Sequence, residues 1–302
     1  MTLPYLHFDV FTTTPLAGNA LAVFLDGRGL DEGTMQRIAR EMNVSESTFI
    51  LPAERADTDA RMRIFTPAVE MPMAGHPTVG STFALAESGT IAAGRERFVF
   101  GLNVGPTPVD LEWAGGALRF VWMTQGTPAF GITADVRHVA EALGLPPGAV
   151  GGTVVEEVSC GVPYLVVPLR DAATVDRVSA DAVSFRRLRE AAGKDLALYL
   201  FAPIDPVAPG YGAGVYARMF APGLGVLEDP ATGSAAGPLG AYLVRHRLVP
   251  DGGRVLVEIT QGVAMGRPSR MQVEVSADGS GTVTKVRVGG QAVLVGRGEL
   301  IL

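Results

Sequence analysis

The sequence predicts an α+β protein built from two similar halves, and two stretches of the chain carry this prediction. The first stretch, from Ile64 to Glu87, reads IFTPAVEMPMAGHPTVGSTFALAE, in which a short apolar strand leads through a glycine-containing turn into helix-compatible residues. The second stretch, from Tyr216 to Tyr242, reads YARMFAPGLGVLEDPATGSAAGPLGAY and repeats that order, with a loop carrying Glu228 and Asp229. No short period recurs, so we interpret the similarity as the duplication of a large unit rather than as a solenoid.

The helices predicted in these stretches, Pro77 to Glu87 and Ser234 to Arg245, are apolar on nearly every face. A helix of this kind is buried all round, so each is expected to form the core of its own curved sheet. Pro77 suits a first helical position because it has no N–H to leave unsatisfied, and Ser234 is a candidate N-cap. Free backbone N–H groups at such helix starts attract anions, so the sequence predicts an anion-binding site at each.

Composition limits the possible functions. The chain has 302 residues, of which 47% are hydrophobic and 19% charged, as in compact globular proteins of one large or two ordinary domains. A net charge of -6 argues against a nucleic-acid partner, which would require a basic face. Cys160 is the single cysteine, and neither a leader-like N-terminus nor a long apolar run is present. We therefore predict a cytoplasmic protein with no membrane partner and a small-molecule substrate.

Periodicity and turn residues predict the elements of the first half. A helix is expected from Asp31 to Met42, with Asp31 as its N-cap and Asn43 at its end. A boundary between the halves is expected in the loop from Thr124 to Phe130. The predicted strands are Leu6 to Phe11, Ala20 to Phe24, Ser47 to Leu51, Arg61 to Phe65, Phe98 to Phe100, Val109 to Trp113 and Leu118 to Met123.

The second half starts again with a helix from Asp135 to Leu143, closed by Gly144. Another helix is expected from Ser179 to Ala192, with Val183 and Leu188 among its core candidates and Gly193 as its stop. The predicted strands are Val154 to Cys160, Tyr164 to Leu169, Leu198 to Phe201, Val215 to Phe220, Val255 to Thr260, Met271 to Val275 and Val283 to Val288.

Several chemistries are disfavoured by the motifs. The run from Gly233 to Gly237 is not a G-x-S-x-G nucleophile elbow, because Ser234 stands one place early. The four histidines show no metal-ligand spacing, and no phosphate loop or dinucleotide fingerprint occurs. The sequence therefore predicts no metal and no cofactor. Taken without further context, Glu46 and Asp229 are also interpretable as solvated loop carboxylates, and His76 as a helix-entry histidine.

A set of motifs in one order along the chain resembles the PhzF (phenazine-biosynthesis) isomerase family, of the diaminopimelate-epimerase-like fold. The motifs are FDVF at 8–11 with GNALAV at 18–23, NVSESTF at 43–49, AGHPT at 74–78, EDPATGSAA at 228–236, QG at 261–262 and MGRPS at 265–269. They span nearly the whole chain, which makes the set far more specific than any one motif.

The resemblance implies two domains, each a curved, mostly antiparallel, barrel-like sheet wrapped around a central helix. We place the first domain at residues 1–125, joined by residues 293–302, and the second at residues 126–292, with the active site in the cleft between them. A homodimer is also expected. By the same resemblance, Glu46 is the general acid/base, which requires a carboxyl with a pKa raised in a dry pocket.

The resemblance assigns His76, Asp229 and Ser234 to substrate binding, with the backbone amides of Gly75, Gly233 and Ser234 facing a substrate carboxylate. It implies a cofactor-independent isomerase that shifts a proton on a small unsaturated amino- or hydroxy-carboxylic acid. Two alternatives stay open. One is an amino-acid epimerase or racemase of the same fold, although the usual pair of catalytic thiols is missing. The other is a non-catalytic protein that binds small acids.

Overall fold

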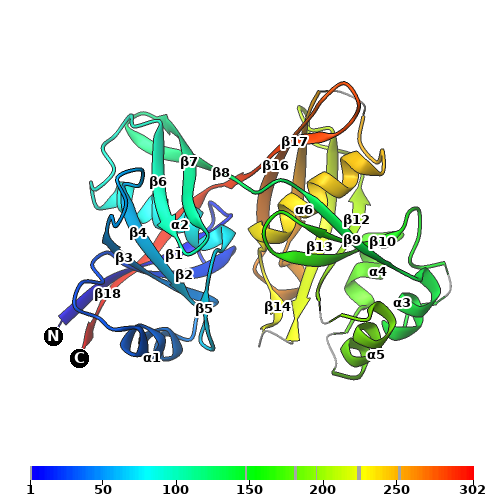
Figure 1. Ribbon diagram of the computed structural model, residues 1–302, viewed down its shortest axis with the longest axis horizontal. Helices are drawn as coiled ribbons and strands as arrows, with labels where there is room; N and C mark the ends of the chain where they lie inside the picture. The colour runs from blue at the N-terminus through cyan, green and yellow to red at the C-terminus, as the bar shows by residue number, and fades with distance from the viewer. Residues whose placement is uncertain (1, 147, 180–181, 195, 223–225, 251–252) are drawn as a thin grey trace. The chain divides into compact units, whose positions relative to one another are not determined.

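The structure, a computed structural model, describes residues 2–146, 148–179, 182–194, 196–222, 226–250 and 253–302. The chain divides into two compact units, which we call unit 1 (Met1–Thr124 with Gly289–Leu302) and unit 2 (Gln125–Val288). Figure 1 labels most of the helices and strands of both units.

In unit 1, hydrogen-bonded neighbours follow the order β18-β1-β2-β3-β4-β6-β7-β8, with β5 beside β4. The pairs β2/β3 and β4/β6 are parallel, and the other pairs named here are antiparallel. The strands are β1 (Thr2–Val10), β2 (Asn19–Phe24), β3 (Glu46–Pro52), β4 (Ala60–Phe65), β5 (Glu70–Met71), β6 (Arg97–Leu102), β7 (Gly105–Ala114), β8 (Ala117–Thr124) and β18 (Ala292–Ile301), and the helices are α1 (Glu32–Met42) and α2 (Gly75–Glu87).

In unit 2, the order is β9-β10-β11-β12-β13-β15-β16, with β14 beside β13, and the pairs β11/β12 and β13/β15 are parallel. The strands are β9 (Ala129–Ala134), β10 (Val155–Ser159), β11 (Pro163–Pro168), β12 (Ala197–Ile204), β13 (Ala213–Ala221), β14 (Val226–Asp229), β15 (Arg254–Gln261), β16 (Ser269–Ala277) and β17 (Val283–Gly290). The helices are α3 (Val136–Ala142), α4 (Ala172–Arg177), α5 (Ala182–Ala192), α6 (Gly233–Arg245) and the 3-10 turn η2 (Val263–Met265).

The two units share one pairing pattern. A hairpin (β1/β2 or β10/β11) is followed by a parallel neighbour, an antiparallel strand with a short side strand, and a second parallel neighbour. The predicted α+β architecture of two similar, mostly antiparallel halves is confirmed. The sequence carries the same duplication as Arg-x-Phe-x-Pro at 63–67 and 218–222, followed by Glu-x-Pro-x-x-Gly at 70–75 and 228–233.

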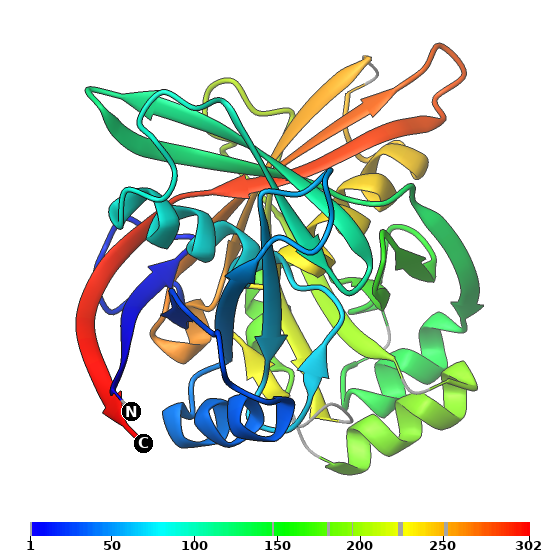
Figure 2. The ribbon, with the colours of Figure 1, turned by 60° about the vertical axis from the view of Figure 1, so that its left-hand side comes forward.

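In each unit, the first strand of the hairpin also pairs with a strand that follows the other repeat in the chain. Strand β9 directly follows β8 of unit 1 in the chain, yet it pairs with β10 in unit 2. Strand β18 directly follows the last strand of unit 2, yet it pairs with β1 from Thr2↔Ile301 to Val10↔Ala292. The two chain ends therefore lie side by side in unit 1 (Figures 1 and 2).

The central helix of each unit is enclosed by strands, as predicted. Every residue of α2 from Gly75 to Leu85 is buried, against β1, β2 and β8. In α6, Gly233 and all residues from Ala235 to Leu243 are buried, against β16, β11 and β10 (Figure 1). Their small residues let the strands approach closely: a Cβ added at Gly240 would lie 2.6 Å from a Val273 methyl.

A second apolar layer covers the other face of each sheet. In unit 1, Met35, Ile38 and Ala39 of α1 pack on Phe24 and Phe49. Asp31 caps α1 by accepting from the Thr34 N–H, and Asn43 ends it at φ 49°, both as predicted. In unit 2, α3, α4 and α5 cover β11 and β12 in the same way. Among the described residues, no helix is long and apolar enough to cross a membrane.

Several local predictions are wrong. Helix α2 begins at Gly75, so Pro77 is its third residue and not its first. The N-cap of α6 is Thr232 and not Ser234. Glu228 and Asp229 lie on strand β14, because Asp229 pairs with Met219 of β13. A four-residue strand gives no periodic signal, which explains why the sequence predicts a loop there.

Other differences lie in unit 2. Strand β9 occupies part of the predicted boundary loop, and helix α4 was not predicted. The Val183 side chain is 48% exposed, whereas Leu188 is buried as expected. Phe185 of α5 packs against Phe220 of β13, with ring centroids 6.0 Å apart, whereas Val183 near the start of the helix lies outside this buried cluster.

Candidate functional site

In unit 1 the structure brings two of the predicted site residues together. Glu46 is the first residue of β3, and His76 is the second residue of α2. The Nε2 atom of His76 lies 3.1 Å from Oε2 of Glu46, although the alignment is not that of a hydrogen bond. Asn19, the first residue of β2, places its Nδ2 atom 3.2 Å from Nδ1 of His76. If the ring proton is on Nε2, the Asn19 amide donates to Nδ1.

Burial controls the charge of His76. Its side chain is 4% exposed, whereas that of Glu46 is 16% exposed. Burial lowers the pKa of His76 to about 3, and a hydrogen bond with the backbone of Ala20 opposes this only in part. The imidazole is therefore neutral at neutral pH, and Glu46 has an uncharged neighbour. The ring nitrogen 3.1 Å from the Glu46 carboxylate therefore belongs to an uncharged group and not to a cation.

The start of α2 offers backbone donors in the same place. Among the described residues, no side chain caps this helix, and its first two residues are Gly75 and His76. The hydroxyl of Thr78 donates instead to the carbonyl of Ala74, at 2.8 Å. The Gly75 and His76 N–H groups precede the first intrahelical hydrogen bonds of an α-helix, so they are suited to a ligand anion.

Unit 2 carries the other predicted side chains, built on a buried polar network. Asp229 is 8% exposed, and the hydroxyl of Thr232 donates to its Oδ2 atom at 2.5 Å. The Gln261 amide donates to the Asp229 carbonyl at 2.7 Å and to Thr232 Oγ1 at 3.0 Å. Tyr199 donates to Gln261 Oε1 at 3.0 Å, and burial raises its pKa well above the ordinary value, so it stays a donor. This network fixes the turn between β14 and α6.

Two further contacts position the start of α6. The hydroxyls of Tyr164 and Ser234 lie 2.7 Å apart, so the Ser234 side chain is oriented by a neighbouring strand rather than by its own helix. The Gln125 amide donates to the Gly233 carbonyl at 2.8 Å. A Cβ at Gly237 would come 1.9 Å from Gln125 Oε1, so this glycine makes room for the contact.

Sequence reasoning missed most of this support. Gln261 occurs in one of the quoted motifs, but it received no role, and Asn19, Tyr164, Tyr199 and Thr232 received none either. The only signal was that Asn19, Thr232 and Gln261 lie inside motifs shared with the family. Tyr164 and Tyr199 gave no signal, because their partners Ser234 and Gln261 are distant in sequence.

The duplication shows which groups are not duplicated. Glu46 pairs in parallel with Leu21, and Ala197 pairs in the same way with Tyr164 of the matching hairpin. The neighbouring pairs agree, because Ser47 faces Phe65 and Leu198 faces Phe220 of the two Arg-x-Phe motifs. Alanine therefore stands in unit 2 where unit 1 has Glu46. The repeat also aligns His76 with Ser234 and Asp229 with Met71.

Metal and thiol chemistry receive no support from these residues. Within the part of the chain that the structure describes, no group of three or more His, Cys, Asp or Glu side chains could hold a metal ion. Cys160 is buried, as expected, and burial raises its pKa to about 12, so the thiol is neutral and unreactive.

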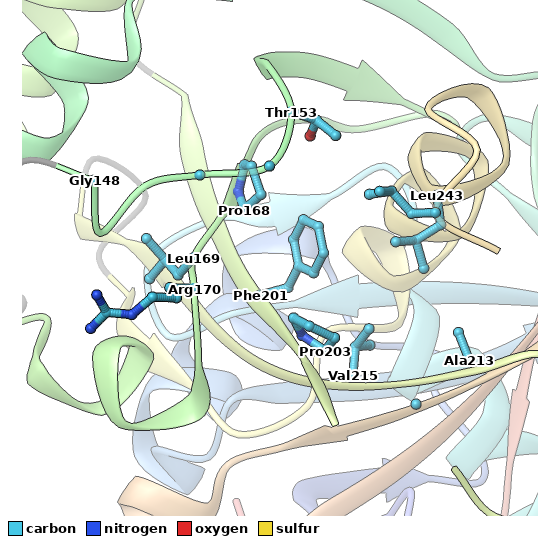
Figure 3. Close-up of a pocket in the computed structure, with 14 residues that line it drawn as sticks. Gly148, Thr153, Pro168, Leu169, Arg170, Phe201, Pro203, Ala213, Val215 and Leu243 are labelled. Carbon is cyan, nitrogen blue, oxygen red and sulfur yellow. The ribbon is translucent and has the colours of Figure 1, made fainter. Parts of the chain in front are cut away.

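An apolar cavity of about 560 Å³ lies elsewhere in unit 2, at the C-terminal end of α6 (Figure 3). Phe201, Pro203 and Val215 form its walls together with Leu243 and Leu248, and the Arg170 guanidinium points away from them. None of the predicted site residues lines this cavity. Leu243 follows Gly233 by ten residues, or roughly 15 Å along a helix, so the cavity is separate from the start of α6.

Known proteins place the chain in a family. The family model described as "Phenazine biosynthesis-like protein" matches residues 8–298. An uncharacterised isomerase of Mesorhizobium japonicum is 39% identical over 100% of this chain and 99% of its own. The trans-2,3-dihydro-3-hydroxyanthranilate isomerase of Pseudomonas aeruginosa is 39% identical over 99% of both chains.

Solved structures agree. The crystal structure of a PhzF-family phenazine biosynthesis protein from Bacillus anthracis superimposes with a TM-score of 0.88, at 26% identity and over 100% of both chains. The relatives are named as isomerases, and the matches run through every motif described above. The chain therefore belongs to the PhzF family and is an isomerase of that family.

Proposed function

We propose that this isomerase moves a proton on a small, unsaturated amino- or hydroxy-carboxylic acid, without a cofactor, by general acid/base catalysis at Glu46. The contact between Glu46 and the buried, neutral His76 carries this proposal. A carboxyl group that both takes and returns a proton is favoured by a dry surrounding, and the buried, neutral ring of His76 is part of such a surrounding for Glu46.

The substrate carboxylate binds at the helix starts in this proposal. The amides of Gly75, Gly233 and Ser234 are hydrogen-bond donors at positive helix ends, where the negative charge of a carboxylate is stabilised. Asp229 and the Ser234 hydroxyl bind the amino or hydroxyl substituent, and His76 orients the reacting part.

The single glutamate favours a proton shift over racemisation. Racemisation by two bases requires one base on each face of a carbon atom, yet Ala197 occupies the position equivalent to Glu46. A shuttle that removes a proton from one carbon and returns it to another on the same face requires only one carboxyl group. The trans-2,3-dihydro-3-hydroxyanthranilate isomerase relatives carry a name that fits this class, and we propose a substrate of similar chemistry.

The remaining expectations complete the proposal. The protein acts on a small acid and not on nucleic acid or membranes, in the cytoplasm, as a homodimer. The net charge of -6 supports the proposal that nucleic acid is not a partner.

The test is a screen of small unsaturated acids by thermal shift, followed by turnover assays on those that bind. Glu46→Gln keeps the size and the hydrogen-bonding reach of the side chain but removes its titrating proton. We expect this variant to bind the acid normally and to lose about a hundred- to ten-thousand-fold in kcat. Glu41→Gln, an exposed carboxylate on α1, is the matched control and should keep full activity. Near-normal turnover by Glu46→Gln would exclude this mechanism.

A further inference from the structure

Each unit carries the same arginine–glutamate pair just before its central helix, and we call each pair a fork. In unit 1, Nε and Nη2 of Arg63 donate to the two carboxylate oxygens of Glu70, at 2.8 and 2.6 Å. In unit 2, the same atoms of Arg218 donate to Glu228 at 2.8 and 2.9 Å. Two parallel hydrogen bonds fix the direction of a side chain as well as its distance.

The forks lie at matching places in the chain. Each glutamate stands on a short side strand, six residues before a predicted site residue: Glu70 before His76, and Glu228 before Ser234. Two residues after each glutamate stands a proline, Pro72 or Pro230. Because the proline ring fixes φ, the segment between the glutamate and the helix start has less backbone freedom. The position of the glutamate is thereby transmitted to the start of α2 or α6.

Each arginine is itself held by a helix on the outer layer. Nη2 of Arg63 also donates to Glu32 at the start of α1, at 2.9 Å. Nη1 of Arg218 donates to the carbonyls of Val175, Asp176 and Val178 at the end of α4, at 3.1, 3.1 and 2.9 Å. Both guanidinium groups lie over the phenylalanine two residues on. A fork therefore joins the outer layer of its unit to the turn that carries the site residues.

Burial sets the forks apart from ordinary surface pairs. The Arg218 and Glu228 side chains are 9% and 16% exposed, and those of Arg63 and Glu70 are both 19% exposed. The fork is also present twice, although the residues that follow it differ: Met71 and His76 in unit 1, Asp229 and Ser234 in unit 2. The fork therefore accompanies the start of the central helix in both units, although the site residues at that start differ.

We infer that the forks are positioning elements of the two half-sites, and this inference rests on the proposed function. Arg63 holds His76 against Glu46, and so serves proton transfer. Arg218 holds Asp229 and the start of α6, and so serves substrate binding. The two arginines have one structural role but separate catalytic consequences, which allows each unit to act as the control for the other.

The test is the same substitution in both units, Arg63→Lys and Arg218→Lys. Lysine keeps the positive charge, but its compact ammonium group cannot form the two parallel hydrogen bonds that the planar guanidinium group makes to a carboxylate. We expect similar losses of Tm in the two variants. With an acid that the wild type turns over, Arg63→Lys should lower kcat about tenfold or more and raise KM by a smaller factor, because the start of α2 carries both His76 and the Gly75 amide. Arg218→Lys should raise KM about tenfold and leave kcat nearly unchanged.

The control is Arg28→Lys, which breaks a pair of the same geometry. Arg28 donates to Asp26 through Nε and Nη2, but these side chains are 70% and 50% exposed and precede no helix start of the site. Its kinetics should match the wild type. If Arg63→Lys and Arg218→Lys instead change kcat and KM alike, in proportion to their loss of Tm, the forks only stabilise the fold and the inference is wrong.

A second readout requires no substrate. The 15N signals of the His76 ring should move in Arg63→Lys and stay in place in Arg218→Lys and Arg28→Lys. If the wild type turns over no acid, the proposed function fails, and these signals still decide on the Arg63 fork. His76 signals that do not respond to Arg63→Lys, or that respond equally to Arg218→Lys, would overturn the inference.

Discussion

The Nε2 atom of His76 lies 3.1 Å from Oε2 of Glu46, in a place where the histidine side chain is only 4% exposed. This relationship has a pH signature, because the pKa of His76 falls from 6.5 to about 3 on burial. Below pH 6.5 the unfolded chain takes up a proton that the folded chain does not. The free energy of unfolding should therefore decrease as the pH falls from 6.5 towards 3, by up to about 1.4 kcal/mol per pH unit from this group.

Urea unfolding of the wild type and of His76→Gln between pH 7 and pH 4 measures this contribution. The variant should lose less stability over that window than the wild type. His138→Gln is the control, because His138 is 70% exposed, and it should follow the wild type. Parallel curves for the wild type and His76→Gln would show that His76 titrates normally in the folded protein.

The start of α6 should bind small anions. Sulfate, phosphate or a small carboxylate should occupy the amides of Gly233 and Ser234 in crystals grown with such ions, and acids that bind should raise Tm. Gly233→Val adds bulk where the ligand must approach, so its affinity for these acids should fall sharply in calorimetric titrations. Gly279→Val changes an open turn glycine of the same unit and should leave affinity intact. Equal affinities in both variants would count against the anion site.

The contact between Tyr164 and Ser234 should matter for binding more than for folding. Tyr164→Phe removes only the hydroxyl that lies 2.7 Å from Ser234 Oγ, so the serine loses its fixed orientation. We expect a roughly five- to tenfold weaker Kd for the substrate acid, which is the scale of one neutral hydrogen bond. Tyr211→Phe, on a loop of unit 2, is the comparison and should bind normally. A Kd unchanged in Tyr164→Phe would mean that Ser234 is positioned by other groups.

Two glycines in the loop between β15 and β16 allow the cost of backbone strain to be measured separately from the cost of a steric clash. Gly262 and Gly266 both have positive φ, at 78° and 68°. A Cβ at Gly262 would lie 2.3 Å from the Arg267 carbonyl and 2.5 Å from that of Pro230, whereas nothing lies within 4 Å of a Cβ at Gly266. Gly266→Ala should cost about 1 kcal/mol in the free energy of unfolding, and Gly262→Ala clearly more. Comparable losses in denaturant titrations would show that the loop relaxes freely.

Much of the fold could be predicted from sequence, because its long elements carry periodic patterns. The two central helices were recognisable as buried all round, and Asp31 and Asn43 marked both ends of α1. Strand β14 and helix α4 are short, so neither contains enough residues to show a period. The repeated Arg-x-Phe-x-Pro and Glu-x-Pro-x-x-Gly motifs were readable in principle, but they are obscured because the gap between them differs in length.

The candidate site was less accessible to sequence. Glu46, His76, Asp229 and Ser234 could be named from family motifs, but their partners could not. Asn19 reaches His76 across 57 residues, and Tyr164 reaches Ser234 across 70. Such contacts depend on which strands become neighbours, and a local pattern carries no record of that. The low pKa of His76 likewise follows from burial by the whole unit and not from its neighbours in the chain.

The strands β9 and β18 bear on how such a chain could have arisen and how it can be divided. A polypeptide with only the first repeat would contain β1 and β9, but its β1 would have no outer neighbour, since β18 fills that place here. Two such polypeptides could complete each other by exchanging their ninth strands. A single-repeat ancestor would then have been an obligate pair, and fusion of its genes would have made the exchange internal. For the same reason, cutting the present chain between its repeats yields two pieces that each expose a bare sheet edge.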